Sequence, residues 1–234
     1  MNTRYFVLDT ETSGLPPHAG VCEIGWIEMD ADLNIVGEVQ ALIDPECPIT
    51  PTASGVHGLV DADVADAPTL SEFFSEDAAG CYGKPLQADR IILCGHKVGF
   101  DLHFVAPHLV GEVVPVDTLR WSRHLYPWCE DHRLNTLRYA LDLPPPSGNA
   151  HRVGYDIPLT YQLLKHLLQT ARMTLDELAE KGRQPLLLHK MSFGKHKGEA
   201  FKDVPASYMR WALDNMDALD PDLEFTFKHY LNNN

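Results

Sequence analysis

Short apolar runs recur along the first half of the chain, near residues 4–9, 23–29, 35–43, 91–95 and 113–117. Each run has the length of a strand that is buried in a sheet. Apolar residues at helical spacing become prominent later, most clearly in the amphipathic stretch Leu159–Leu168. We therefore predict an α/β fold with a mixed five-stranded sheet flanked by helices.

A different pattern begins near residue 173. Thr174 and Glu177 have the spacing of a capping box, which predicts a short helix, and the segment from Gly182 to Pro185 predicts a hinge. A chain of 234 residues is long enough for one well-buried domain and a small appendage. We predict a domain over residues 1–173 and a small C-terminal module over residues 185–234.

Two carboxylates mark the end of the first apolar run. Asp9 and Glu11 close the run Tyr5–Leu8, and residues i and i+2 of a strand point to the same side of a sheet. Such a pair repels itself unless divalent cations neutralise it, so the pair predicts Mg²⁺ or Mn²⁺. The alternative is a structural role, which we predict for Asp222 and Glu224, a pair with the same spacing at a predicted helix start.

Two further segments supply acidic residues and a histidine. Asp101 follows the apolar run ending at Gly95 and lies in the first turn of a predicted helix, where the helix dipole alone favours an acidic residue. His151 lies in a polar loop, where its structural alternative is a solvated surface side chain. Asp156 begins the amphipathic segment, and Pro158, which suits a first helical turn, predicts a helix start near Asp156.

Taken in order, these residues resemble the three motifs of the DEDDh, or DnaQ-like, 3′-to-5′ exonuclease superfamily. The motifs are Asp9-x-Glu11, Asp101 and His151-x-x-x-x-Asp156, with matching support from Thr12–Leu15, Cys22–Gly25 and Val56–Gly58. The resemblance covers roughly residues 4–172. It implies a ribonuclease H-like fold, in agreement with the predicted sheet.

The resemblance also implies a chemistry. Asp9, Glu11, Asp101 and Asp156 are expected to hold two Mg²⁺ ions, with Mn²⁺ as a substitute, in a two-metal site. His151 is expected to be the general base that takes a proton from water. The expected products are nucleoside 5′-monophosphates.

Four residues are expected near the substrate, namely Thr12, Leu15, His57 and Lys97. Relatives hold the terminal nucleotide with groups at the first two positions, although Leu15 is equally well explained by packing under the prolines that follow it. A turn-capping role explains His57 equally well. Lys97 replaces the asparagine of many relatives, and its ammonium group is suited to a substrate phosphate.

The tail resembles the C-terminal module of exonuclease X-type proteins through Ser192–Gly198, Asp203–Tyr208 and Arg210-Trp211, which favours DNA over RNA. With 33 acidic and 19 basic residues the net charge is −14, so attraction to a polyanion must be local and salt-sensitive. The tail gathers the cations and aromatic rings suited to gripping a strand: Lys190, Lys195, Lys197, Lys202, Phe193, His196 and Phe201. The alternative is a solvated lysine-rich hairpin with the aromatic residues in its core.

Cysteine usage and hydropathy favour a cytoplasmic protein. The cysteines are odd in number and form no CxxC pair, which argues against a disulfide framework and a zinc site: Cys22, Cys47, Cys81, Cys94 and Cys129. No stretch reaches the roughly 20 apolar residues of a membrane span, and the N-terminus lacks a signal-peptide pattern.

The leading hypothesis is a Mg²⁺-dependent 3′-to-5′ exodeoxyribonuclease that acts on DNA with a free, single-stranded 3′ end, in repair or turnover. Three alternatives stay open: a 3′-to-5′ exoribonuclease, a proofreading subunit whose C-terminal module binds a repair or polymerase partner, and a catalytically silent nucleic-acid-binding module. The intact acidic motifs weigh against the last.

Overall fold

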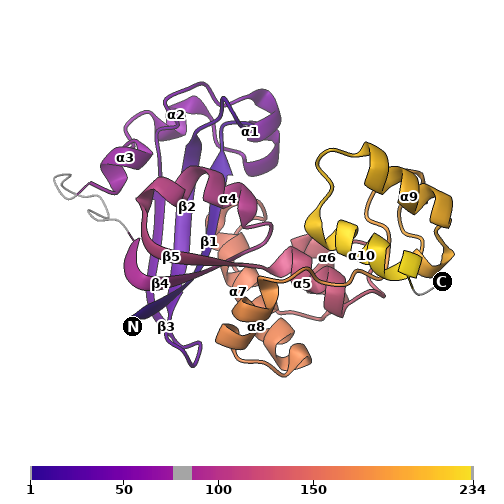
Figure 1. Ribbon diagram of the computed structural model, residues 1–234. Coiled ribbons are helices and arrows are strands. Elements are labelled where there is room, and N and C mark those ends of the chain that lie inside the picture. Colours follow the sequence, from indigo (N-terminus) through magenta and orange to yellow (C-terminus); the bar gives the residue numbers. More distant parts are fainter. Residues whose placement is uncertain (1, 76–85, 233–234) are drawn as a thin grey trace.

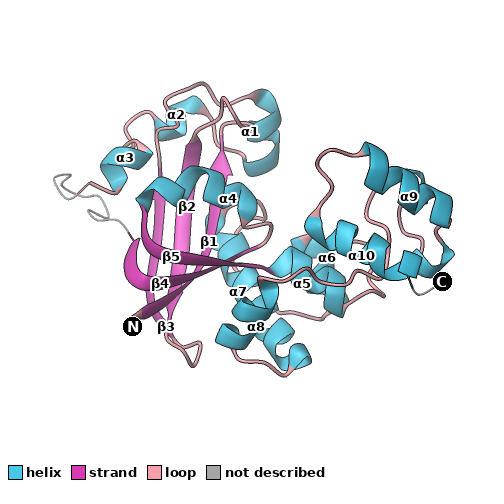
Figure 2. Ribbon diagram, viewed as in Figure 1, coloured by secondary structure: helices cyan, strands magenta, loops and turns pink. Residues whose placement is uncertain are grey.

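The computed structural model describes residues 2–75 and 86–232, so Cys81 lies outside the described residues. Its five strands are β1 (Thr3–Thr12), β2 (Val21–Met29), β3 (Ile35–Leu42), β4 (Leu86–Gly95) and β5 (Leu109–Asp117). They form one sheet in the order β3-β2-β1-β4-β5. β2 pairs antiparallel with both β1 and β3, whereas β4 pairs parallel with β1 and β5. The predicted mixed five-stranded sheet, flanked by helices, is confirmed (Figure 2).

Helices connect and follow the strands (Figure 1). Those in the first part of the chain are α1 (Pro51–His57), α2 (Asp61–Val64), α3 (Leu70–Phe73), α4 (Gly99–Val105), α5 (Thr118–Leu125), α6 (Leu134–Ala140) and α7 (Val153–Ala171). They are followed by α8 (Leu175–Gly182), α9 (Ala206–Asn215) and α10 (Pro221–Asn232). Short 3₁₀ turns are η1 (Ala106–His108), η2 (Gly194–His196) and η3 (Phe201–Asp203). No helix among the described residues is long and apolar enough to cross a membrane.

Strand β1 separates two apolar cores because its side chains alternate between the faces of the sheet. Tyr5 and Val7 belong to the core that also contains the apolar face of α7. Phe6 and Leu8 belong to the opposite core, against which Leu102 of α4 packs. Beyond Leu8, the odd-numbered side chains of β1 therefore face α7, and the even-numbered side chains face α4.

Helix α7 corrects one expectation. It begins at Val153, so Pro158 lies inside the helix rather than in its first turn. The amide that proline lacks would have bonded to the carbonyl of Gly154, only one residue into the helix, where solvent is close. The predicted capping box is confirmed, because the Thr174 side chain accepts from the Glu177 amide and Glu177 reaches back to the Thr174 amide.

The last part of the chain has a core of its own. Leu188, Phe201, Met209 and Phe227 are among its buried residues, and they belong to neither sheet-associated core. Phe201 is fully buried and packs against Phe227 with ring centroids 5.7 Å apart. Phe201 is therefore a core residue, as the alternative of a hairpin with an aromatic core predicts. The four lysines of the tail are exposed: Lys190, Lys195, Lys197 and Lys202.

A partly buried ion pair attaches this second core to α5. The Arg120 guanidinium donates to both carboxylate oxygens of Asp222, with Nη2–Oδ1 at 2.7 Å, and to the carbonyls of Gly182 and Gln184. Asp222 Oδ1 also accepts the Leu186 amide at 2.7 Å. Asp222 is thus at the start of α10 with a structural role, as predicted. In Figure 1 the yellow elements α9 and α10 lie beyond α5 and α6 from the sheet.

We expect Asp222→Asn to lower the free energy of unfolding by about 1.5–3 kcal/mol, because hydrogen bonds between charged groups contribute in this range. Urea unfolding followed by tryptophan fluorescence measures the loss. Asp217→Asn, at an exposed position of the same segment, is the control. Equal stability of the two variants would contradict a role for the ion pair in attaching the second core.

Candidate metal-binding active site

Asp9 and Glu11 extend the face of β1 that carries Tyr5 and Val7. Since that face packs against α7, both carboxylates point toward the helix that begins at Val153. Asp156 lies in the first turn of this helix. Carboxylate oxygens of Asp9, Glu11 and Asp156 all lie within 4.8 Å of one another.

Asp101 reaches the same strand end from the opposite face. It lies in the first turn of α4 and is 3% exposed. The Thr10 amide and hydroxyl donate to its Oδ1 at 3.0 and 2.7 Å. Because Thr10 has the parity of Leu8, it faces α4 and fixes Asp101 beside Asp9. The Asp101 charge is the strongest electrostatic influence on Asp9.

The four carboxylates disfavour one another's ionisation. Burial first, and the charge of Asp101 second, raise the pKa of Asp9 well above its usual value. Burial, followed by the charge of Asp156, raises the pKa of Glu11 to about 8. Burial is also the main cause that raises the pKa of Asp101 to about 7 and that of Asp156 to about 6.

This donor set fits a divalent cation. Asp9 Oδ2 is buried and has no hydrogen-bond partner, an arrangement that is unfavourable for a carboxylate unless a cation contacts it. Oxygen donors of this kind suit hard cations such as Mg²⁺. The acidic cluster is therefore a candidate metal site.

We expect the metal-free protein to become less stable as pH rises from about 5 to 8. The pKa values of Glu11, Asp101 and Asp156 are raised in the folded state to about 8, 7 and 6, so folding favours their protonated forms. That contribution is fully present below the pKa of an unfolded carboxyl and is lost through the folded-state values. Thermal unfolding in chelator at several pH values measures the trend.

The same titration with Mg²⁺ provides the control. A cation at 100 times its dissociation constant adds about 2.7 kcal/mol, and its charge favours the ionised carboxylates, so the decline toward pH 8 should flatten. A stability that rises from pH 5 to 8 in chelator would contradict the clustering of these acids.

His151 lies next to the acids on an exposed loop. Its φ is 61°, in the left-handed region that a residue with a side chain seldom adopts. Its amide donates to Asp156 Oδ2 at 3.1 Å, which ties the loop to the acidic cluster. The structure thus brings the predicted histidine to the predicted aspartate through the backbone.

Of the residues predicted to lie near the substrate, Thr12 and His57 are buried and Leu15 is exposed. The Thr12 hydroxyl donates to the Gly14 carbonyl at 2.7 Å, and the Thr12 carbonyl lies 3.2 Å from His57 Nε2. His57 is buried and accepts the Leu59 amide at Nδ1, as its turn-capping alternative expects. Leu15 is 79% exposed, so it does not pack beneath the prolines.

Lys97 is exposed in the turn between β4 and α4, with φ at 74°. Its amide donates to Asp117 Oδ1 at 3.0 Å, and its ammonium nitrogen lies 5.6 Å from the centroid of the Phe100 ring. The ammonium group therefore lies over a ring of α4.

Sequence reasoning missed two supporting interactions. Glu23 is 1% exposed, stands opposite Glu11 in the sheet and accepts two hydrogen bonds from Arg152 at 2.8 Å each. An acidic residue inside the apolar run 21–29 is the signal that pointed to it. His96 is also buried, and burial lowers its pKa to about 4 while its nitrogens bond to Thr118 and to the His132 carbonyl.

The chain is similar to known exonucleases. Exodeoxyribonuclease 10 of Escherichia coli (strain K12) is 32% identical in an alignment 232 residues long, which covers 97% of this chain and 98% of that protein. A solved structure of exonuclease X in complex with 5′ overhanging duplex DNA has a TM-score of 0.60 and 27% identity, covering 75% of this chain and 98% of that one.

A more distant structure shares the fold. E. coli exonuclease I in complex with a dT13 oligonucleotide has a TM-score of 0.53 and 16% identity, covering 73% of this chain and 42% of that one. A family model described as "Exonuclease" matches residues 6–164. The chain therefore belongs to the exonuclease family, as a DEDDh-type, DnaQ-like member similar to exodeoxyribonuclease 10 and exonuclease X.

Proposed function

We propose that the protein is a Mg²⁺-dependent 3′-to-5′ exodeoxyribonuclease that releases nucleoside 5′-monophosphates, in DNA repair or turnover. The observation that carries the proposal is the convergence of Asp9, Glu11 and Asp156 within 4.8 Å, with Asp9 Oδ2 buried and unpartnered. The strong similarity to an exodeoxyribonuclease along nearly the whole chain supports DNA as the substrate.

Asp9, Glu11, Asp101 and Asp156 would hold two Mg²⁺ ions. When bound, such ions supply an activated water and offset the negative charge that develops on the phosphoryl oxygens. Thr10 fixes the Asp101 carboxylate with two hydrogen bonds, so this carboxylate is oriented before substrate arrives. His151, on its exposed loop, takes the proton of the attacking water.

The 3′ end of the strand would lie along the loop that follows β1. Leu15 is 79% exposed at the start of that loop, where an apolar side chain is available to contact the terminal base. Thr12 and His57 hold the loop in place through their hydrogen bonds. We assign these two residues to positioning and Leu15 to contact with the substrate.

We further propose that residues 1–173 are the nuclease domain and residues 185–234 a separate module. The second apolar core supports this division, because its members all follow residue 187. The module contacts nucleic acid in this proposal. A repair or polymerase partner bound through it is the alternative.

The test uses 5′-labelled and 3′-labelled oligonucleotides of DNA and RNA, with Mg²⁺ or chelator. Single strands and duplexes with a 5′ overhang are compared, since exonuclease X has been solved with the latter. A metal-dependent ladder from 5′-labelled DNA, absent with Asp9→Asn, is the expected result. Preferential shortening of RNA would instead assign an exoribonuclease, and no cleavage of either would leave a binding module.

A further inference from the structure

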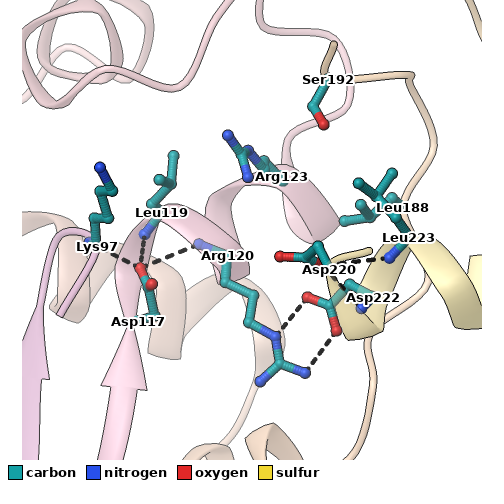
Figure 3. Close-up of a pocket in the computed structure, with 10 residues that line it drawn as sticks. All are labelled: Lys97, Asp117, Leu119, Arg120, Arg123, Leu188, Ser192, Asp220, Asp222 and Leu223. Carbon is teal, nitrogen blue, oxygen red and sulfur yellow. Dashed lines mark hydrogen bonds and ion pairs between the residues drawn. The ribbon is translucent and has the colours of Figure 1, made fainter. Parts of the chain in front are cut away.

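A cleft of about 220 Å³ lies between the nuclease core and the C-terminal residues (Figure 3). One wall comes from Lys97 in the β4–α4 turn, from the beginning of α5 and from Arg123 in the last turn of α5. The other wall comes from Ser192 and from the start of α10. The cleft is therefore built by both cores.

The carboxylates of the cleft already have donors. Asp117 accepts the amides of Lys97, Leu119 and Arg120 as the N-cap of α5. Asp220 accepts two amides at the start of α10. Asp222 is paired with the Arg120 guanidinium. Asp117 and Asp220 accept these amides at Oδ1, and both oxygens of Asp222 accept from Arg120, so fixed donors partly compensate each carboxylate.

Arg120 is paired with Asp222, but the other two cations of the cleft, Lys97 and Arg123, have no carboxylate bonded to them among the described residues. Arg123 is half-buried, yet within residues 2–75 and 86–232 its guanidinium makes no hydrogen bond or ion pair. The Lys97 ammonium contacts the Phe100 ring alone in the same part of the chain. In Figure 3 the charged ends of both residues and the Ser192 hydroxyl lie on one side, and the Arg120–Asp222 pair lies on the other.

The positive charge of Arg123 acts on neighbours that include Asp117 and His132. The pKa of the neighbouring His132 is lowered to about 4, by burial first and by the positive charge of Arg123 second. No Arg123 nitrogen is among the buried, unpartnered polar atoms of the described residues, so its five N–H donors remain open to solvent and to an acceptor. An anion in the cleft would accept from them.

The donors suit a phosphate group. A guanidinium fork, an ammonium group and a hydroxyl are the side-chain groups that proteins commonly present to backbone phosphates. The cleft also has the right location, because β1, β4 and β5 run parallel and their carboxyl ends share one edge of the sheet. Asp9 lies near the end of β1 and Asp117 ends β5, two strands away, which is about 10 Å at the usual strand spacing.

We propose that this cleft binds a backbone phosphate of the nucleic-acid strand, away from the scissile bond, through Arg123, Lys97 and Ser192. The inference rests on the proposed function, since it extends the path of the same strand. It explains how a chain of net charge −14 attracts a polyanion, by a local cationic site beside its acidic cluster.

The test compares Arg123→Gln with Lys165→Gln, which removes the same charge from an exposed position on α7. Two substrates separate the cleft from the acidic cluster: a 12-nucleotide DNA strand, and the p-nitrophenyl ester of thymidine 5′-monophosphate, too short to reach α5. Arg123→Gln should raise KM about five- to twentyfold for the strand and leave ester hydrolysis unchanged. Ser192→Ala should raise the same KM by a smaller factor without a change of charge.

Equilibrium binding of a labelled 12-nucleotide strand in chelator keeps the test independent of catalysis. The slope of log K against log salt should fall by about 0.7 in Arg123→Gln, the value for one phosphate contact on a single strand. The inference would be overturned if Arg123→Gln and Lys165→Gln had equal slopes. It would also be overturned if Arg123→Gln impaired cleavage of the strand and hydrolysis of the ester by the same factor. If Arg123→Gln altered inhibition by inorganic phosphate while strand binding stayed unchanged, the cleft would hold a free anion and the inference would fail.

Failure of the proposed function looks different. In that case neither substrate is hydrolysed by the unaltered protein with Mg²⁺, while the binding measurement still decides the cleft. Melting temperatures of the variants show whether each remains folded.

Discussion

Replacing Asp9 by asparagine should lower kcat by about 10³-fold or more and, in chelator, make the protein more stable. Loss of a metal ligand removes several kcal/mol of charge stabilisation, and each 1.36 kcal/mol is a factor of ten. The gain in stability follows from the structure, because Asp9 is crowded by Asp101, Glu11 and Asp156 and its pKa is raised. Asparagine has nearly the same shape and carries no charge.

Both halves of this prediction are measurable on one preparation. Ester hydrolysis gives kcat, and thermal unfolding in chelator should show a midpoint about 2–4 °C higher for each kcal/mol gained. Glu224→Gln is the matched control, since Glu224 belongs to the second Asp-x-Glu pair and is exposed at the start of α10. If Asp9→Asn were both inactive and less stable, Asp9 would have a structural role and the metal site would be in doubt.

Replacing His151 by asparagine should lower kcat by roughly 10²–10⁴-fold, the range for loss of a general base. Asparagine is chosen because it tolerates a positive φ, so the backbone at 61° and the amide bond to Asp156 are retained. The exposed side chain contributes little to the cores, and the melting temperature should not change. The loss therefore isolates the imidazole.

The pH dependence of kcat gives the decisive readout. With Mg²⁺ in excess, which favours the ionised carboxylates, an imidazole base produces the acid limb of the profile, and this limb should disappear in His151→Asn. His103→Asn is the control, because His103 is exposed on α4 only two residues after Asp101. An unchanged acid limb with unchanged kcat would assign His151 to the solvated surface and leave the base to another group.

The parts of the site that the sequence predicted are those governed by local periodicity. Period-two alternation places Asp9 and Glu11 on the face of Val7. The grouping of Asp156 with them was implied by the resemblance to the exonuclease motifs, and the packing of α7 on that face accounts for it. The sheet was predictable from local periodicity.

The remaining parts depend on contacts between distant segments. Glu23 and Arg152 are separated by 129 residues, and no local sequence pattern predicts that they form an ion pair. The Thr10–Asp101 bonds require α4 to cover the opposite face of the sheet. The cleft at Arg123 requires the position of the C-terminal residues against α5, which no local pattern encodes.

The Arg120–Asp222 pair has a consequence for protein engineering. A shortened nuclease that ends near residue 185 would keep Arg120 but lose its carboxylate, and the carbonyl of Gln184 would lie at a frayed end. The guanidinium would then remain against α8 with part of its donors unsatisfied, which favours local unfolding or self-association. A truncation designed for crystallisation should therefore carry Arg120→Met, so that the exposed end of the nuclease domain is left without an orphaned charge.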